Sequence, residues 1–439
     1  MNDPLGDEAL DLAIGHELHG WMGDLFPLCR SITGNGVRDT LKYLKRHVPE
    51  LQLHEVPTGT QVFDWTIPDE WNIADAYIAD LDGHRLVDFR ASNLHVVSYS
   101  EPVDAVLTRE QLEPHLYSLP DEPSAIPYVT SYYRRTWGFC VSHAQRQSLG
   151  PGPFHVKIDA TLEPGSLTYA DAVLPGDTDD EILISSYVCH PSLANNELSG
   201  PVVITALGRW IRQLPRRRYT YRLVYAPETI GSITYLSRHL DHLKRHVKAG
   251  WVVTCVGDDR EYSYLPSRFG DTLADRVAKQ VLADVAGDYH AYSFLDRGSD
   301  ERQWCSPGAD LPVCSVMRSK YGTYPEYHSS LDDLSLVSPN GLAGGYAVMQ
   351  RCVELIEANA RWRMVMPCEP QLGKRGLYPT TSIRANETEQ LLNLLNVVAY
   401  CDGSGDVVDL CRNTGARSDQ VIDIISTLAE AGVVERLGS

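Results

Sequence analysis

The sequence predicts an α/β protein with a mostly parallel sheet and helices on both faces, plus a small β-rich inserted domain and a C-terminal winged helix. Three observations support this prediction. The 439 residues are more than one ordinary hydrophobic core holds. Strand-like and helix-like patterns alternate over residues 155–361. The segments on either side of that region follow different patterns, which indicates separate modules.

The N-terminal segment, residues 8–47, has apolar residues at helical spacing in "ALDLAIGHELHGWMGDLF" and again in "GVRDTLKYLKRHV". A glycine-rich turn with two cations, Arg30 and Arg38, separates them. Over residues 51–150, short β-like runs such as "LQLHEV" and "NLHVVSY" are interrupted by Pro, Gly and Asp. We therefore expect residues 51–150 to form the inserted domain.

The central region alternates strand-like runs with helical patterns. The runs are "EILISSYV", "YRLVYAP", "WVVTCVG" and "LPVCSVM", and a helical pattern follows each of them. This alternation is typical of parallel strands joined by crossover helices. Residues 1–50 and 151–365 are therefore expected to form one discontinuous α/β domain.

The last segment, residues 366–439, is predicted to be a linker and a winged helix, because three short helical patterns precede a final strand. Residues 381–439 contain four Arg and no Lys against nine Asp and Glu, a balance of −5. Nucleic-acid binding depends on neutralising phosphates, so we expect this module to pack or to form a homo-oligomer rather than to bind DNA.

The composition excludes several classes of protein. A hydrophobic content of 43% is too high for a disordered chain. No run of 18 apolar residues and no basic-then-apolar leader are present, so we expect a cytoplasmic protein without a membrane partner. The ten cysteines occur singly, which favours reduced thiols. The net charge of −19 again argues against nucleic acid.

Polar side chains follow four of the predicted strands. His190 follows the first strand, Glu228 the second, residues 254–259 lie at or after the third, and His328 follows the fourth. Ligands of open α/β sheets bind beyond the carboxyl ends of the strands. These groups are therefore expected to meet at one edge of the sheet.

Two histidines with a carboxylate are donors that suit Zn²⁺, and an ionised Glu suits the role of base toward a metal-bound water. These residues could also have purely structural roles: His190 and His328 as hydrogen-bonded histidines, and Glu228 as a helix cap. Asp258 and Asp259 also suit an ordinary turn. The residue types alone leave these alternatives open.

The segment "CHPSLANNELSG" resembles the first metal-binding segment of M28-like zinc aminopeptidases. "APETIG" resembles their glutamate segment, and "YHSSLDDL" resembles their closing histidine segment. Nearly the whole chain is similar to bacterial aminopeptidase-like proteins with an inserted β-rich domain and a C-terminal winged helix. This resemblance implies an aminopeptidase-like fold, a zinc cofactor and a small substrate with an amide bond.

The sequence departs from the peptidase pattern at the anionic ligands. Asn196 stands at the position of the Asp that bridges two zinc ions, with Glu197 beside it. Thr229 replaces the second Glu of a Glu-Glu pair, and a further Asp would fall near Thr254 or Cys255. Neutral side chains are poor substitutes for carboxylates toward zinc.

Three arrangements follow from these departures. Glu197 replaces the lost Asp, so that one zinc is held by His190, Glu197 and His328, with Glu228 as base. Alternatively, a different set that includes Glu228, Cys255 or Asp258 binds the metal. In the third arrangement, the site is free of metal and binds or transforms a small molecule by other means.

The resemblance also suggests supporting roles. Arg302 or Tyr324 would stabilise an oxyanion, and Asp300 would orient a histidine ligand. The structural alternative for the charged residues of "GSDER" is a local network of ion pairs. The preferred interpretation is a zinc-dependent hydrolase that cleaves an amide bond of a small amino-acid or peptide-like substrate. The alternative is a peptidase scaffold that binds a small molecule without hydrolysing it.

Overall fold

The computed structural model describes residues 12–377 and 385–438. The described chain forms two compact units. The larger unit comprises residues 12–274 and 290–346, and the smaller one comprises residues 275–289 and 347–438. No helix among the described residues is long and apolar enough to span a bilayer.

The larger unit is built on an eight-stranded sheet with the order β1-β10-β12-β11-β13-β16-β14-β15. The four strands β12, β11, β13 and β16 are parallel to one another. β1 and β10 pair antiparallel with their neighbours, whereas β14 is antiparallel to β16 and parallel to β15. Every residue of β11 and β12 is buried, which fits strands covered on both faces. The bounds are β1 (Gln52–Pro57), β10 (Ser166–Leu174), β11 (Glu181–Tyr187), β12 (Thr220–Ala226), β13 (Val247–Val253), β14 (Ser263–Leu265), β15 (His290–Ala291) and β16 (Val313–Met317).

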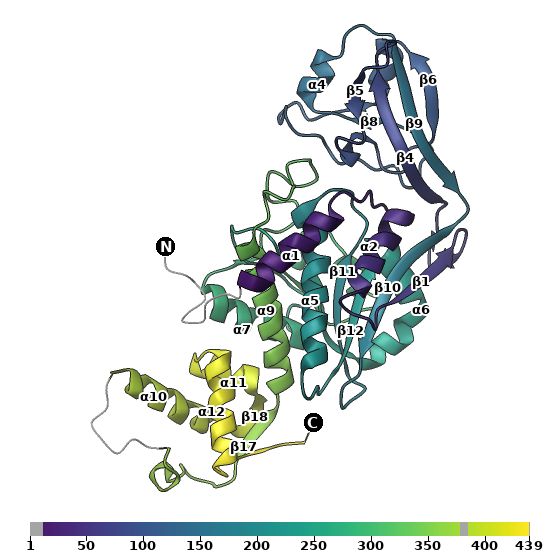
Figure 1. Ribbon diagram of the computed structural model, residues 1–439. Coiled ribbons are helices and arrows are strands. Elements are labelled where there is room, and N and C mark those ends of the chain that lie inside the picture. Colours follow the sequence, from purple (N-terminus) through teal and green to yellow (C-terminus); the bar gives the residue numbers. More distant parts are fainter. Residues whose placement is uncertain (1–11, 378–384, 439) are drawn as a thin grey trace. The chain divides into compact units, whose positions relative to one another are not determined.

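The connections reverse direction at the centre of this sheet. Helix α5 (Ser199–Gln213) leads from β11 to β12 on one side, and α6 (Ile230–His246) leads from β12 back past β11 to β13. Since such crossovers are right-handed, α5 and α6 cover opposite faces. Helices α1 (Leu12–Leu25) and α2 (Asn35–Lys45) contact α5 (Figure 1). This arrangement confirms the predicted α/β class and creates a switch point at the carboxyl end of β11, where ligands bind in such folds.

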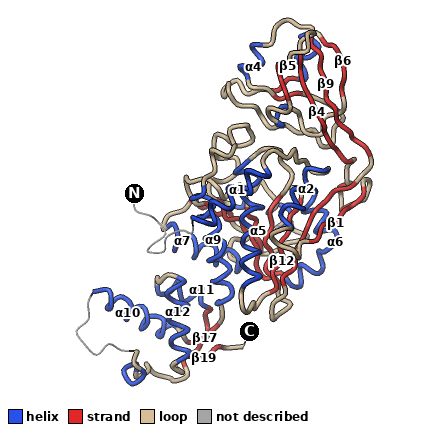
Figure 2. Tube along the Cα trace, in the orientation of Figure 1, coloured by secondary structure: helices blue, strands red, loops and turns tan. Residues whose placement is uncertain are grey.

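A second, four-stranded sheet has the order β5-β4-β9-β6 (Figure 2). Its strands are β4 (Glu70–Ala79), β5 (Arg85–Asp88), β6 (Val103–Leu107) and β9 (Phe154–Glu163). Residues 52–57, which the sequence places in the inserted domain, pair with β10 in the large sheet. Residues 154–163, which it places in the α/β domain, pair with β4 and β6. The local sequence pattern predicted these strands, but which strands pair with each other depends on contacts between residues far apart in the sequence.

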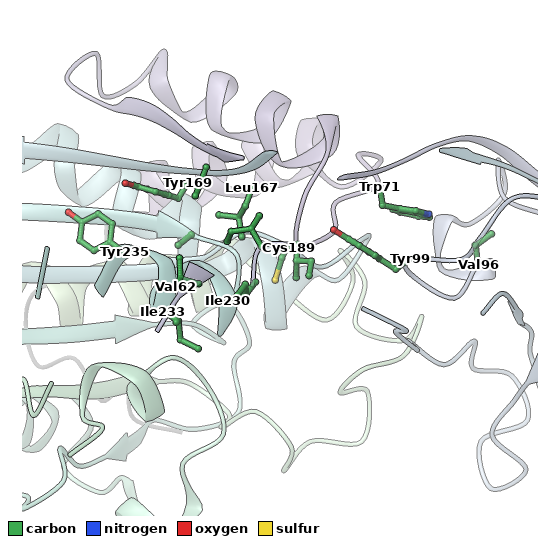
Figure 3. Packing of buried hydrophobic residues seen from close by; sticks show 14 of the residues in the cluster. Val62, Trp71, Val96, Tyr99, Leu167, Tyr169, Cys189, Ile230, Ile233 and Tyr235 are labelled. Atoms are coloured by element: carbon green, nitrogen blue, oxygen red, sulfur yellow. The ribbon is translucent and has the colours of Figure 1, made fainter. Parts of the chain in front are cut away.

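Shorter elements complete the larger unit. They are β2 (Gln61–Val62), β3 (Trp65–Thr66), β7 (Leu116–Tyr117), β8 (Phe139–Cys140), α3 (Arg109–Leu112), α4 (His143–Ser148), the π-helical turn η3 (Ala194–Leu198) and α8 (Glu301–Trp304). One cluster of buried side chains runs through both sheets. Trp71, Val96 and Tyr99 come from the inserted domain, while Leu167 and Tyr169 come from β10 (Figure 3). The shared core ties the inserted domain to the edge of the large sheet.

The smaller unit contains the predicted winged helix. A three-stranded sheet with the order β18-β17-β19 accompanies three helices, and α11 and α12 contact each other and α10. Asp406 caps α11 by accepting the N–H of Asp409. The bounds are β17 (Arg361–Met364), α10 (Ala385–Tyr400), β18 (Asp402–Asp406), α11 (Val407–Thr414), α12 (Ser418–Glu430) and β19 (Val434–Arg436). Two further helices, α7 (Leu273–Ala286) and α9 (Pro339–Ala358), include residues of both units.

Candidate active site at the carboxyl edge of the sheet

His190 follows β11 and is buried at the switch point of the sheet. Its Nδ1 lies 2.8 Å from Oε2 of Glu197, and its main-chain oxygen accepts a hydrogen bond from Nε of Arg30 at 2.8 Å. Burial alone would lower the pKa of His190, but Cys189 and Glu197 beside Nδ1 raise that pKa well above its ordinary value. With Nδ1 engaged, Nε2 is the free ring atom, and it lies 3.7 Å from Oε2 of Glu228.

Glu197 lies behind His190 with no exposed side-chain surface. Its Oε1 accepts the N–H of Cys189 at 2.8 Å and lies 3.4 Å from Nε of the buried Arg30. Cys189, His190 and Glu197 form one of two groups among the described residues whose donor atoms lie within 4.8 Å of one another. A cation placed on Glu197 would face the guanidinium of Arg30. The geometry therefore favours an orienting position for Glu197 over the direct ligation expected from the sequence.

Glu228 stands just beyond β12, where its backbone N–H donates to Sγ of Cys189 at 3.2 Å. Burial raises the pKa of its carboxyl group, and His190 opposes that rise. The next residue, Thr229, has a left-handed φ of 64° and donates its N–H to Oδ1 of Asp300 at 2.8 Å. Strained backbone of this kind is held in place by its surroundings and is common at functional sites.

His328 lies on the loop after β16, also with a left-handed φ, of 56°. Its ring stacks on Tyr327 and lies 5.6 Å from the ring of His190, measured between centroids. Burial and the neighbouring His190 lower the pKa of His328 to about 3, so the ring is neutral near pH 7. Nε2 of His328 is buried and has no hydrogen-bond partner within the described chain.

Asn196, at the expected metal-bridging position, lies in the buried turn η3. Its Nδ2 donates to the hydroxyl of Tyr187 at 2.6 Å, and that hydroxyl lies 2.5 Å from Oγ1 of Thr254, which in turn donates to the main-chain oxygen of Asn196. This chain of hydrogen bonds fixes the amide. Oδ1 of Asn196 is left buried without a partner among the residues that the structure describes.

The other three predicted site residues take different positions. Asp300 accepts from the backbone of Thr229 and from the hydroxyl of Ser232, so it supports the turn after Glu228 rather than a histidine. Tyr324 donates its hydroxyl to Asp332 at 3.0 Å and does not line the cavity described below. Arg302 does not line the cavity either, but its Nη2 donates at 2.9 Å to Oγ1 of Thr229, which does.

The sequence analysis did not single out Asp332, which lies four residues after His328. Its carboxylate accepts the N–H groups of Ala194, Asn195 and Asn196, at 3.1, 2.6 and 2.9 Å, and so fixes the start of η3. Burial raises the pKa of Asp332 to about 6. The "LDDL" that trails His328 was the available signal, but only the fold shows which of the two aspartates turns inward.

His190, Glu228 and His328 line a cavity of about 290 Å³, whereas Asn196 and Glu197 lie outside its lining. Its polar wall comes from the large sheet and includes His190, Glu228 and His328. Its aromatic wall comes from the inserted domain, a contribution that the sequence analysis missed. These residues are Trp65, Tyr128, Tyr132 and Tyr133. The aromatic run "YVTSYYRRTW" was the signal, but its proximity to the sheet depends on the backbone bond from Tyr128 N–H to His328 O, at 2.8 Å.

The donors around the cavity fit one metal ion better than two. His328 Nε2 and Asn196 Oδ1 are buried without a partner among the described residues, and His190 Nε2 lies 3.7 Å from Oε2 of Glu228. Glu228 is the one carboxylate among the described residues that line the cavity. A catalytic zinc needs about three protein ligands and one open position. A second ion would lack anionic ligands, because Asn196, Thr229 and either Thr254 or Cys255 stand where the resemblance to the aminopeptidase pattern implies carboxylates.

Residues 19–359 match the family described as a domain of unknown function (DUF4910). The chain belongs to this family. Residues 360–436 match a winged helix-turn-helix family. A protein of Clostridium acetobutylicum, named as a candidate polysaccharide biosynthesis protein with an aminopeptidase-like domain, is 43% identical over 91% of this chain and 92% of its own length.

Solved structures with a similar fold are also known. The crystal structure of a candidate peptidase from Clostridium acetobutylicum has a TM-score of 0.91 and 40% identity, over 97% of both chains. A zinc aminopeptidase from Bacillus subtilis has a TM-score of 0.56 at 10% identity, over 79% of this chain and 94% of its own. An M28 peptidase precursor from Shewanella amazonensis has a TM-score of 0.56 at 12% identity, over 79% and 93%. These two likenesses confirm the aminopeptidase-like fold.

Proposed function

We propose that this protein is a zinc-dependent hydrolase that cleaves an amide bond of a small amino-acid or peptide-like substrate. The observation that carries the proposal is that the imidazoles of His190 and His328 line one cavity with the half-buried carboxylate of Glu228. A buried nitrogen without a partner, as in His328, is costly unless a ligand satisfies it. A metal ion is a ligand that would satisfy this nitrogen.

In this proposal His190, His328 and Asn196 hold the ion, and Glu197 keeps the ring of His190 in place. A bound zinc supplies a polarised carbonyl and a water of lowered pKa. Glu228 accepts the proton of the attacking water and passes it to the leaving amine. The raised pKa of its carboxyl group suits both the acceptance and the return of a proton.

Arg302 takes the oxyanion role in preference to Tyr324. The Tyr324 hydroxyl donates to Asp332, whereas the guanidinium of Arg302 donates to Thr229, which lines the cavity. Thr229 occupies the position of a metal-binding carboxylate in the aminopeptidase pattern. Arg302 therefore places one positive charge near the region that a second ion would otherwise serve.

The relatives support a hydrolytic scaffold and widen the choice of substrate. One solved relative is named as a candidate peptidase, and one sequence relative is named as a candidate polysaccharide biosynthesis protein. N-acylated amino sugars contain the same amide group as peptides. Screening should therefore include acylated amino sugars as well as aminoacyl amides.

A second candidate function is small-molecule binding without hydrolysis. The observation in its favour is that neutral residues, Asn196, Thr229 and Thr254 or Cys255, replace the carboxylates of the aminopeptidase pattern, which weakens metal binding. The two candidates differ in metal content and turnover, so one set of measurements separates them.

The test is zinc content by inductively coupled plasma mass spectrometry together with hydrolysis of the two amide panels. We expect about one zinc per chain. His190→Ala and His328→Ala should each lose zinc while keeping the circular dichroism spectrum of the parent, and His16→Ala, at an exposed position, serves as the matched control. Zinc-free protein after reconstitution, or full zinc in both variants, would contradict the ligand assignment. One zinc without turnover of any amide would favour the binding function.

A further inference from the structure

A second hollow adjoins the cavity on the inserted domain. It is a groove of about 170 Å³, and Tyr132 and Tyr133 line both the groove and the cavity. The side chain of Tyr133, which the two share, is exposed to solvent. The remaining groove residues are Pro68, Asp69, Tyr99, Ser131, Arg134, Arg135 and Leu162.

The cavity itself suits a ring. Its volume of about 290 Å³ is at the small end of ligand sites and matches one residue-sized group. Trp65 and Tyr133 meet edge to face with ring centroids 5.5 Å apart, and the hydroxyls of Tyr128 and Tyr132 lie 2.7 Å apart. Aromatic walls with hydroxyl groups offer both stacking faces and hydrogen bonds. A substrate larger than one ring must extend beyond the cavity, and the groove is next to it.

The groove carries one uncompensated cation. Arg135 is paired with Asp69 at 2.6 Å and lies 3.9 Å from Glu101. Arg134 is exposed, and its guanidinium makes no ion pair or hydrogen bond within the described residues. The whole chain has a net charge of −19, so an unpaired positive charge beside the cavity contrasts with the acidic character of the protein. Arginine binds phosphates and carboxylates through paired N–H groups.

We propose that the substrate is a ring-bearing amide with an anionic group, a phosphate or a carboxylate, that binds at Arg134. The ring would stack in the aromatic cavity with its amide toward Glu228, and the anionic group would lie past Tyr132 and Tyr133. This inference rests on the proposed function for the position of the amide, but the binding preference that it predicts needs no turnover.

The test compares three probes that differ in charge. They are N-acetylglucosamine, N-acetylglucosamine 1-phosphate and N-acetylmuramic acid, whose carboxylate replaces the phosphate. Binding to the full chain is measured by isothermal titration calorimetry at low ionic strength. We expect at least one anionic probe to bind about tenfold more tightly than the neutral sugar, because a hydrogen bond to a charged group adds about that much affinity. The probe that gains affinity identifies the anion.

Two variants assign the effect to residues. Arg134→Gln should remove the advantage of the anionic probe and leave the neutral sugar unchanged, and Arg90→Gln, another exposed arginine of the inserted domain, should remove nothing. Trp65→Ala should weaken all three probes. Equal affinity for the three probes, an advantage that survives Arg134→Gln, or no binding of any sugar would overturn the inference. If one of these results is found but the protein still hydrolyses amides, only the inference about the anionic substrate is wrong. If the protein prefers the anionic sugar but holds no zinc and hydrolyses no amide, only the proposed hydrolase function is wrong.

Discussion

Glu197 accepts the Nδ1 proton of His190 at 2.8 Å, and this contact turns Nε2 of His190 toward Glu228. The same carboxylate offsets the charge of Arg30, which is fully buried. One side chain therefore stabilises a buried cation and orients a candidate metal ligand. A partner of this kind fixes the tautomer of a ligating histidine.

Glu197→Gln is expected to weaken zinc binding by about 10- to 100-fold, because the histidine loses its orienting carboxylate. The same change leaves Arg30 unpaired and should cost about 3 kcal/mol of stability. Zinc affinity is measured by competition with a chelating dye, and stability by urea unfolding. The double variant Glu197→Gln, Arg30→Met should recover stability without recovering zinc affinity. If both recover together, Glu197 affects zinc only through folding.

Asn196→Asp is expected to tighten zinc binding by at least about tenfold, because a carboxylate replaces a neutral donor. The hydroxyl of Tyr187, which now accepts from Asn196, can instead donate to the new carboxylate. Zinc affinity and stoichiometry are measured by titration, with Asn393→Asp of the winged helix as the control for added charge. Unchanged affinity would mean that this side chain does not face the ion.

The pair Arg38 and Glu70 predicts a pH dependence of stability. Arg38 donates to both carboxylate oxygens of Glu70, and these hydrogen bonds lower the pKa of Glu70 to about 2. Because this pKa is below the unfolded value near 4.5, the stabilisation is complete above about pH 5 and is lost as the pH falls toward 2. Allowing for partial exposure, we expect a contribution of about 2 kcal/mol.

The measurement is the free energy of unfolding in urea at pH 6 and at pH 3.5. Glu70→Gln should lower stability at pH 6 and reduce the difference between the two pH values. The exposed Glu122→Gln is the matched control and should change neither. An unaltered pH dependence in Glu70→Gln would show that other carboxylates dominate acid unfolding.

The sequence determined the class of the fold and the strand ends that carry chemistry. Alternating patterns around "EILISSYV" and "YRLVYAP" required parallel strands, and parallel strands bring their carboxyl ends to one edge. His190, Glu228 and His328 line one cavity, whereas residues 254–259, which were expected at the same edge, are not part of its lining. The sequence also showed that neutral residues, Asn196 and Thr229, replace carboxylates, because this requires only the amino-acid type at each position of the motif.

Tertiary structure decided the direction of each side chain and the partners of each strand. Glu197 stands beside Asn196 in the sequence, yet it faces Arg30, and the hydroxyl of Tyr324 faces Asp332. The aromatic wall of the cavity comes from a domain whose position depends on backbone contacts such as the one between Tyr128 and His328. Such choices depend on which buried polar groups find partners once distant segments meet, and the local sequence does not contain that information.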